Sequence, residues 1–83
     1  MHYEKYELAP RYDGRKSFWK KAYVEVMGTT KVLYSYGTLV AIISKRGTEF
    51  TQDAWYSLTT RRHVREFCRQ ECIADPYGKQ GGK

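Results

Sequence analysis

Four arginines fall within nine consecutive positions near the C-terminal end of the sequence: Arg61, Arg62, Arg65 and Arg69. In a helix, Arg62, Arg65 and Arg69 recur at intervals of three and four residues and therefore line one face, the arginine stripe. The guanidinium group suits phosphate because it is planar, always charged and rich in donors. The stripe is a candidate contact to DNA, RNA or a nucleoprotein. The alternative is a solvated face that Glu71 and Glu66 partly neutralise, with Glu66 one helical turn from Arg62.

Basic and aromatic residues alternate between positions 15 and 23. Lys20 and Lys21 could hold a nucleic-acid backbone while neighbouring rings stack on bases. The alternative is that Phe18 or Trp19 fills the small core and leaves the two lysines exposed. In either case Lys20 and Lys21 are candidate binding residues.

Other aromatic residues offer flat contact area with a polar edge. If the first two predicted strands pair, Tyr23, Tyr34 and Tyr36 can share the sheet face opposite Leu33, although the same tyrosines could lie at the rim of the core. Trp55 and Tyr56 precede the predicted helix. The aromatic candidates for binding are Tyr34, Tyr36, Trp55 and Tyr56.

The nucleophiles and metal-ligating residues form no recognised catalytic pattern. His63 lies near the start of the predicted helix, where it suits a hydrogen bond or a contact to an anion. It points about 140° away from Cys68 on a helix, which argues against a metal site with Cys68 and Cys72. Ser57 and Thr59 lie in no nucleophile elbow or triad. We therefore expect no enzyme, no metal, no cofactor and no small-molecule substrate.

The order of patterned segments predicts an α+β fold. Alternating or β-branched residues predict strands at 21–27, 31–36 and 39–44, with a short fourth strand at 49–51. A connection at 53–58 leads to an amphipathic helix from about Thr60 to Cys72 or Ile73, capped by Thr59 or Thr60. Its apolar face is expected to carry four residues: Val64, Phe67, Cys68 and Cys72. We expect a small antiparallel sheet of three to four strands with one C-terminal amphipathic helix packed on one face.

The 83 residues leave room for one domain. Residues 1–17 are polar, rich in tyrosine and interrupted by Pro10 and Gly14, which predicts an extended arm. Residues 18–74 form the predicted β-strands-then-helix domain. Residues 75–83 are expected to be a flexible basic tail.

Charge and composition narrow the class of partner and the compartment. Fifteen Lys and Arg against nine Asp and Glu give a net charge of +6, which favours an acidic partner. The sequence has no apolar run with a length of about 18 residues, so no membrane segment is expected. It also lacks the apolar region of a signal peptide. Two cysteines four positions apart suggest free thiols. We expect a protein of the bacterial host cytoplasm.

Two segments, 33–43 and 55–67, resemble a family of small uncharacterised proteins of bacteriophages, prophages and other mobile elements. The family pattern has a Ser-Tyr-x-Thr…Val-Ala strand followed by a Tyr-Ser-x-Thr-Thr-x-Arg-His-x-x-Glu-Phe helix start. The matching residues are Ser35, Tyr36, Thr38, Val40, Ala41, Ile43, Tyr56, Ser57, Thr59, Thr60, Arg62, His63, Glu66 and Phe67. Gly37 departs from the Asn or Asp of the pattern, and Cys68 departs from its Leu.

The resemblance implies a domain of strands followed by a helix, in a mobile-element setting, with no assigned catalytic residues. Small phage accessory proteins often bind and disable a host or defence component such as a CRISPR nuclease. We therefore expect a non-enzymatic accessory protein that binds nucleic acid or a host nucleoprotein, in the manner of an anti-CRISPR protein. The alternative is a protein–protein module without nucleic-acid affinity, such as a homodimer joined through an open sheet face or strand edge.

Overall fold

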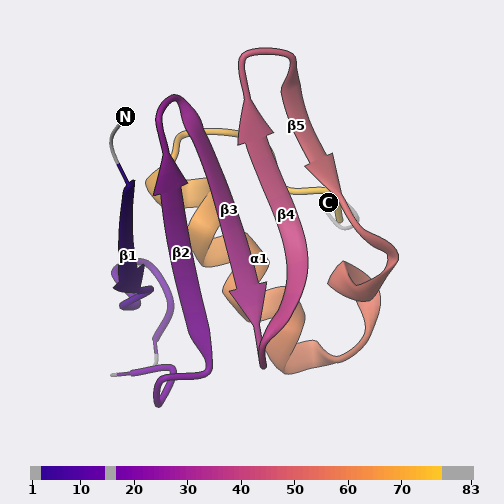
Figure 1. Cartoon of the computed structure of the whole chain (residues 1–83). Helices are drawn as coiled ribbons and strands as arrows, with labels where there is room; N and C mark the ends of the chain where they lie inside the picture. The colour runs from indigo at the N-terminus through magenta and orange to yellow at the C-terminus, as the bar shows by residue number, and fades with distance from the viewer. Residues whose placement is uncertain (1–2, 15–16, 78–83) are drawn as a thin grey trace.

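The computed structural model describes residues 3–14 and 17–77. Its elements are β1 (Tyr3–Glu7), β2 (Ala22–Met27), β3 (Thr30–Ser35), β4 (Thr38–Ser44), β5 (Gly47–Phe50), the short 3-10 helix η1 (Gln52–Trp55) and α1 (Leu58–Gln70). The five strands form one antiparallel sheet in sequence order, and α1 lies across one face of that sheet (Figure 1). The α+β class with a C-terminal helix is confirmed. The predicted number of three to four strands was wrong, because the sheet has five.

The additional strand, β1, lies within the segment that the sequence suggested was an extended arm. It pairs with β2, and Tyr6 lies opposite Val24. All of its side chains except that of Tyr6 are exposed. An edge strand with one half-buried position has almost no apolar alternation, which explains why the pattern did not reveal it. Directly after β1, the side chain of Leu8 is buried in the core.

One face of the sheet is covered by α1, and the other face is open (Figure 1). Ala22, Val24 and Val26 point toward the helix, as their alternation predicted, and Val24 lies opposite Leu33. In β4 the register shifts at a bulge, so that adjacent Val40 and Ala41 are both buried. A bulge breaks strict alternation, and this accounts for the continuous apolar run in that strand.

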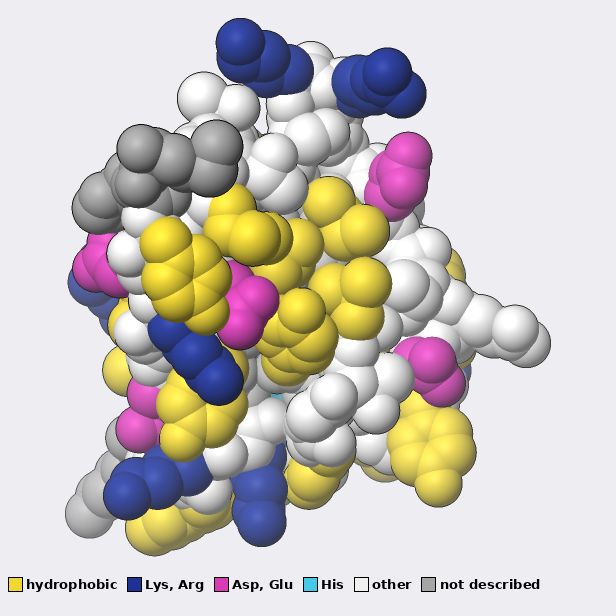
Figure 2. All heavy atoms as spheres, in the orientation of Figure 1, with side chains coloured by type: hydrophobic (Ala, Val, Ile, Leu, Met, Phe, Trp, Pro, Cys, Tyr) yellow, Lys and Arg dark blue, Asp and Glu magenta, His cyan; other side chains and the backbone are white. Residues whose placement is uncertain are grey.

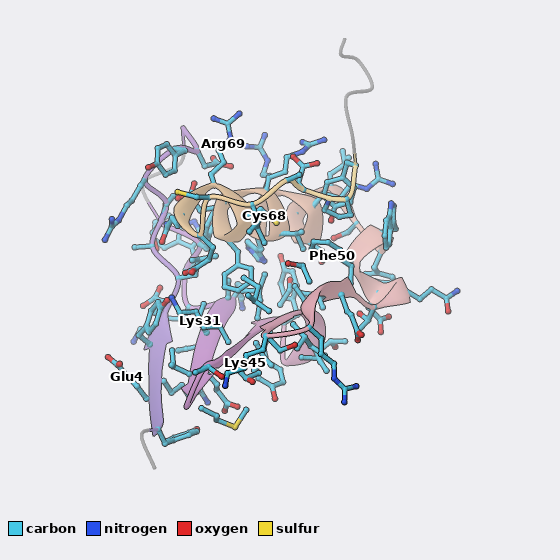
Figure 3. The ribbon with its side chains drawn as sticks, turned by 90° about the horizontal axis from the view of Figure 1, so that it is seen from above. Glu4, Lys31, Lys45, Phe50, Cys68 and Arg69 are labelled. Atoms are coloured by element: carbon cyan, nitrogen blue, oxygen red, sulfur yellow. The ribbon has the colours of Figure 1, made fainter. Side chains whose placement is uncertain are left out.

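The core lies between the sheet and the helix. Figure 3 shows this layer from the end, with Phe50 between the two elements. Phe18 is buried and Trp19 is exposed, which settles which ring of that segment fills the core. The buried hydrophobic residues are Leu8, Phe18, Ala22, Val24, Val32, Leu33, Val40, Ala41, Ala54, Val64, Phe67, Cys68 and Tyr77.

The helix begins and ends about two residues earlier than the sequence predicted. Its N-cap is Ser57, whose Oγ accepts a hydrogen bond from the backbone N–H of Thr60 at 3.1 Å. The predicted cap at Thr59 or Thr60 was wrong, because a serine just upstream already satisfies that donor. The helix ends before Cys72, which has a left-handed backbone with φ of 60°. Cys72 is exposed rather than part of the apolar face.

The end of the described chain returns to the core. Tyr77 is buried, and its hydroxyl donates to the carbonyl of Ala54 at 2.6 Å. Burial raises the pKa of Tyr77 to about 12. This residue therefore belongs to the folded domain and not to the predicted tail. Residues 78–83, where the rest of that tail was predicted, lie outside the described residues.

The segment after β1 is anchored to the helix by one buried carboxylate. The side chain of Glu66 accepts hydrogen bonds from the backbone N–H groups of Arg11 (2.7 Å), Tyr12 (3.0 Å) and Asp13 (2.9 Å). Gln70 donates from its side-chain amide to Glu66 and to the carbonyl of Ala9 at 2.7 Å. Three consecutive N–H groups pointing at one carboxylate form an anion-binding nest.

The nest explains how a charged side chain with only 2% exposure is tolerated at Glu66. Burial alone would raise the pKa of this carboxyl group. The hydrogen bonds from Gln70 and from the three backbone N–H groups outweigh burial, and the pKa lies below its ordinary value of 4.5. The folded state therefore favours the ionised form.

Replacing the anchor should destabilise the fold. In Glu66→Gln the side-chain amide turns N–H donors toward backbone N–H donors, so we expect a loss of about 2 kcal/mol in the free energy of unfolding. Urea denaturation followed by circular dichroism measures this loss. Glu49→Gln, at an exposed position, is the matched control and should change stability little. Equal stability of both variants would show that the nest does not hold the loop.

The same anchor should give the protein an acid-sensitive component of stability. Because the folded-state pKa of Glu66 is lowered, the unfolded chain takes up this proton first as the pH falls. The contribution is complete above about pH 5 and is lost as the pH falls from there through the folded-state pKa. The difference in unfolding free energy between the parent and Glu66→Gln should therefore shrink on acidification. A difference that stays constant down to about pH 3 would contradict this assignment.

Candidate functional site

The arginine stripe lies on the outer face of α1. Arg62, Arg65 and Arg69 are exposed, and Figure 3 shows Arg69 pointing away from the sheet. Arg62 pairs with Asp13 at 3.3 Å and not with Glu66, because Glu66 is turned inward to hold the loop. Glu71 pairs with Lys31 at 2.8 Å. Within the described residues, neither glutamate forms an ion pair with the stripe; Asp13 compensates Arg62, and Glu66 lines a shallow hollow with Arg65 and Arg69.

Arg61 and Trp55, two further candidates, belong to a different group around Tyr77. The guanidinium groups of Arg61 and Arg65 lie 5.6 and 5.2 Å from the centre of the Tyr77 ring. Trp55 meets the same ring edge-on at 5.6 Å. Arg65 thus belongs to the stripe and also contacts the group around Tyr77. These contacts fix the guanidinium positions by cation–π attraction.

Several other candidates gather at one end of the molecule, where β2 and α1 begin and the turn joins β3 to β4 (Figure 1). Lys20, Lys21, Tyr36 and Tyr56 are exposed there, and Tyr36 and Tyr56 have 53% and 82% of their surface accessible. The ammonium of Lys21 lies 6.0 Å from the centre of the Tyr36 ring. Trp19, with 70% exposure, lies in the same region. We call Trp19, Lys20, Lys21, Tyr36 and Tyr56 the aromatic end.

Tyr34 is separate from both groups, because it lies on the open face of the sheet. It is half-buried opposite Tyr23, whose ring has the ammonium of Lys5 at 5.2 Å. Figure 2 views this face and shows hydrophobic side chains gathered over the middle of the sheet. Lys and Arg side chains lie beyond them at both ends of the view. The predicted sharing of one face holds for Tyr23 and Tyr34 but not for Tyr36, which lies in the turn.

Beneath the aromatic end, a buried polar cluster joins the two sequence motifs. The hydroxyl of Ser35 lies 3.2 Å from that of Thr60 and 2.8 Å from Nδ1 of His63. Ser57 adds a hydrogen bond to the Thr60 hydroxyl at 3.1 Å. The His63 ring contacts Phe18, with ring centres 4.6 Å apart. His63 is fully buried beneath the aromatic end, where it also lines a hollow that includes Trp19 and Tyr36.

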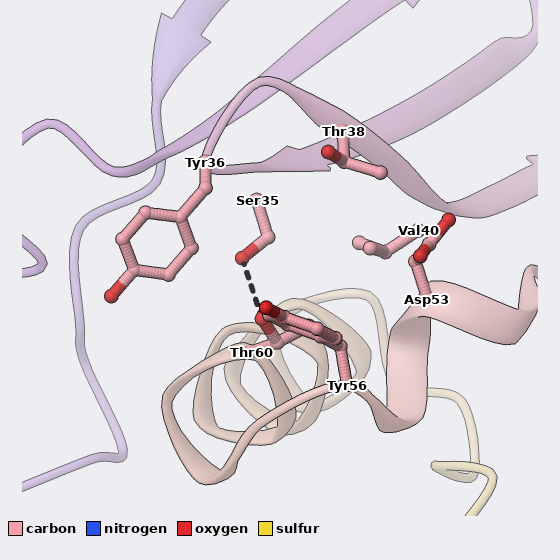
Figure 4. A pocket seen from close by; sticks show the side chains of 7 residues that line it. All are labelled: Ser35, Tyr36, Thr38, Val40, Asp53, Tyr56 and Thr60. Carbon is pink, nitrogen blue, oxygen red and sulfur yellow. Dashed lines mark hydrogen bonds between the residues drawn. The ribbon is translucent and has the colours of Figure 1, made fainter.

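A cavity of about 260 Å³ opens beside the cluster (Figure 4). Ser35 and Thr60 line it together with Tyr36 and Tyr56. Thr38, Val40 and Asp53 complete the lining. Figure 4 shows Asp53 at the side of the cavity formed by η1, across from the turn that carries Tyr36. The lining thus combines hydroxyl groups, one carboxylate and aromatic surface.

A second hollow, of about 180 Å³, lies on the other side of Tyr36. Trp19, Lys21 and Thr59 line it with Tyr36. Tyr36 therefore borders both hollows. Sequence reasoning did not select Trp19, Thr38 or Asp53 for the site. The only sequence signal for them was the motif position of Thr38 and the alternation of basic and aromatic residues around Trp19.

Left-handed backbone positions shape the aromatic end. Tyr36 and Gly37 have φ of 53° and 79° in the two-residue turn between β3 and β4. Gly, Asn and Asp all tolerate this region, which explains why Gly37 can replace the Asn or Asp of the motif. Trp19 and Lys20 have φ of 54° and 61°. Residues other than glycine adopt such angles at a cost in free energy. Residues strained in this way concentrate at functional sites.

Two other kinds of site are absent from the part of the chain that the structure describes. No group of three or more His, Cys, Asp or Glu residues is placed to hold a metal ion in residues 3–14 and 17–77. Over the same residues, no helix has the length and apolar character needed to span a membrane. Both cysteines are free thiols.

Residues 6–81 match the model of a family of unknown function, DUF8033, and the chain belongs to that family. The match includes both motifs and the whole of the aromatic end. Neither the curated proteins nor the solved structures contain a match to the chain. Membership of an uncharacterised family is thus confirmed, while the mobile-element setting stays a prediction.

The two thiols should differ sharply in reactivity. Burial raises the pKa of Cys68 to about 12, whereas Cys72 is exposed just beyond the helix. Because the thiolate is the reactive form, we expect a thiol reagent to modify Cys72 in the native protein and both cysteines in denaturant. Cys72→Ser should abolish the native reaction. Rapid native modification of Cys68 would contradict its placement in the core.

Proposed function

We propose that this protein is a non-enzymatic binding protein whose arginine stripe contacts the phosphates of nucleic acid, either free or within a host nucleoprotein. The observation that supports this proposal is the exposure of Arg62, Arg65 and Arg69 on one helix face. Of these, only Arg62 has an ion pair among the described residues. Guanidinium groups one helical turn apart can follow a phosphate backbone. The net charge of +6 would attract the same partner from a distance.

The two glutamates nearest to the stripe are bound to other partners, and this supports the same proposal. Glu66 is the residue best spaced to neutralise Arg62, and its carboxylate is instead fully used by the backbone of residues 11–13. Glu71 is engaged by Lys31. Arg65 and Arg69 have no ion pair among the described residues, and exposed charge contributes little to folding, so a binding role accounts for it better than a structural one.

The burial of the polar cluster favours binding over catalysis. Ser35 and His63 have the residue types of a nucleophile and a base, at a hydrogen-bonding distance of 2.8 Å. Ser35 is only 2% exposed and its hydroxyl is already engaged by Thr60 and His63, so it is poorly placed to attack a substrate. In the mobile-element setting that the resemblance implies, the target would be a host nucleoprotein such as a defence nuclease. Binding would then inhibit it.

The stripe can be tested by removing its charge. We expect Arg62→Gln, Arg65→Gln and Arg69→Gln together to weaken nucleic-acid binding at least tenfold, because each contact to phosphate releases a counterion. The slope of log affinity against log salt should also fall by about two to three. Fluorescence anisotropy of a labelled oligonucleotide between about 50 and 200 mM salt measures both quantities.

A matched control separates the stripe from net charge. Lys5→Gln, Lys45→Gln and Arg46→Gln remove the same charge from exposed positions in β1 and in the β4–β5 turn. This control should keep most of the affinity and salt dependence. Equal affinities and equal slopes for the two triple variants would show that the stripe is not the binding site. Salt-independent self-association of the parent in sedimentation would instead favour a homodimer through the open sheet face.

A further inference from the structure

The aromatic end has the features of a site for an unpaired base. It brings together three exposed rings, two lysines and the cavity of about 260 Å³ beside Tyr36. We propose that this end binds a single-stranded segment of nucleic acid, with one base in the cavity and its neighbour stacked on Trp19. The inference rests on the proposed function and adds the kind of nucleic acid and the place where a base is held.

Trp19 is exposed on a backbone conformation that carries an energetic cost. Trp19 and Lys20 both have left-handed backbones, which residues other than glycine rarely adopt. The hydroxyl of Ser17 accepts from the N–H of Trp19 at 2.8 Å, and the carboxylate of Glu7 accepts from that of Lys20 at 3.0 Å. The N–H of Lys21 donates to the carbonyl of Phe18 at 3.0 Å.

These hydrogen bonds stabilise a loop that buries Phe18 and leaves the larger indole in solvent. Burying the indole of Trp19 would add hydrophobic stabilisation, and the exposed position lacks that contribution. An exposed indole on a backbone held in place is suited to stacking, because less backbone entropy is lost when a partner binds. Sequence-independent single-strand binding uses such rings beside a basic track.

The lining of the cavity suits a base better than a phosphate group. Asp53 is an anion at its side, which disfavours a phosphate there and favours a base, whose imide or amino N–H groups can donate to the carboxylate. Thr38 adds an exposed hydroxyl group to the lining, and the hydroxyls of Ser35 and Thr60 lie buried and hydrogen-bonded to each other behind it. The phosphates would then lie outside, toward the positive charge of Lys20 and Lys21. A base in a duplex cannot enter such a cavity without leaving its stack.

Single-tryptophan variants can detect stacking directly. Trp55→Phe leaves Trp19 as the only tryptophan, and Trp19→Phe leaves Trp55. We expect single-stranded oligothymidylate of about twelve nucleotides to quench emission in the first variant much more than in the second. An abasic strand of the same length carries the phosphates without the bases and should not quench Trp19.

Affinity measurements then separate base binding from phosphate binding. Tyr36→Asn removes the ring at a position where Asn tolerates the left-handed backbone, and should weaken oligothymidylate binding about tenfold while leaving abasic-strand binding unchanged. Tyr3→Ala is the matched control, because Tyr3 is 58% exposed at the end of β1 opposite to Glu7, which contacts the Trp19 loop. Thermal unfolding of each variant verifies that the fold is retained. Oligouridylate in place of oligothymidylate distinguishes RNA from DNA as the preferred strand.

The outcomes distinguish this inference from the proposed function. Equal binding of oligothymidylate, the abasic strand and a duplex, with Trp19 unquenched and binding still dependent on the stripe, would overturn the base site and leave the stripe in place. Absence of binding to any of the three at low salt would overturn both. Quenching confined to base-containing single strands, together with the expected loss in Tyr36→Asn, supports the base site.

Discussion

The contact between Glu66 and the backbone of residues 11–13 determines how the rest of the chain is arranged. A buried carboxylate is costly to leave without donors, and a run of exposed backbone N–H groups is an open binding site for an anion. Each satisfies the other here. The contact closes the chain over the helix and allows Leu8 and Phe18, on either side of the loop, to enter the core. A small sheet covered by a single helix thereby gains apolar area that the helix alone does not supply.

The same contact sets the electrostatics of the helix surface. A glutamate four residues after Arg62 would ordinarily lie beside it and reduce its charge. Because Glu66 points inward, the outer face of α1 keeps exposed guanidinium groups at Arg65 and Arg69, and Arg62 turns to Asp13 in the anchored loop. Folding and surface charge are thus coupled through one side chain. This coupling gives a physical reason for Arg62, His63 and Glu66 to occur together in a short motif.

The fold could be predicted from the sequence wherever a periodic pattern reports burial. The alternation in β2 and the helical spacing of Val64, Phe67 and Cys68 gave the central hairpin and the helix correctly. The edge strand β1 could not be predicted in this way, because four of its five side chains face solvent. The buried role of Glu66 was also beyond reach, since its three backbone donors lie more than fifty positions away in the sequence. For the site, residue types suggested arginine and tyrosine contacts, but only tertiary structure divides them among the stripe, the Tyr77 cluster, the open sheet face and the aromatic end.

The two proposed surfaces would contribute different properties to binding. Phosphate contacts along the stripe supply affinity that depends on salt and is independent of sequence. The cavity beside Tyr36 could instead distinguish an unpaired base from a paired one, because only an unstacked base can reach Asp53 and the hydroxyl groups. Glu7 links β1 to the Trp19 loop through the N–H of Lys20, and Glu66 fixes the intervening segment to α1. Each surface therefore includes residues held by the same N-terminal segment, so the order of that segment would determine whether stripe and cavity can engage one strand together.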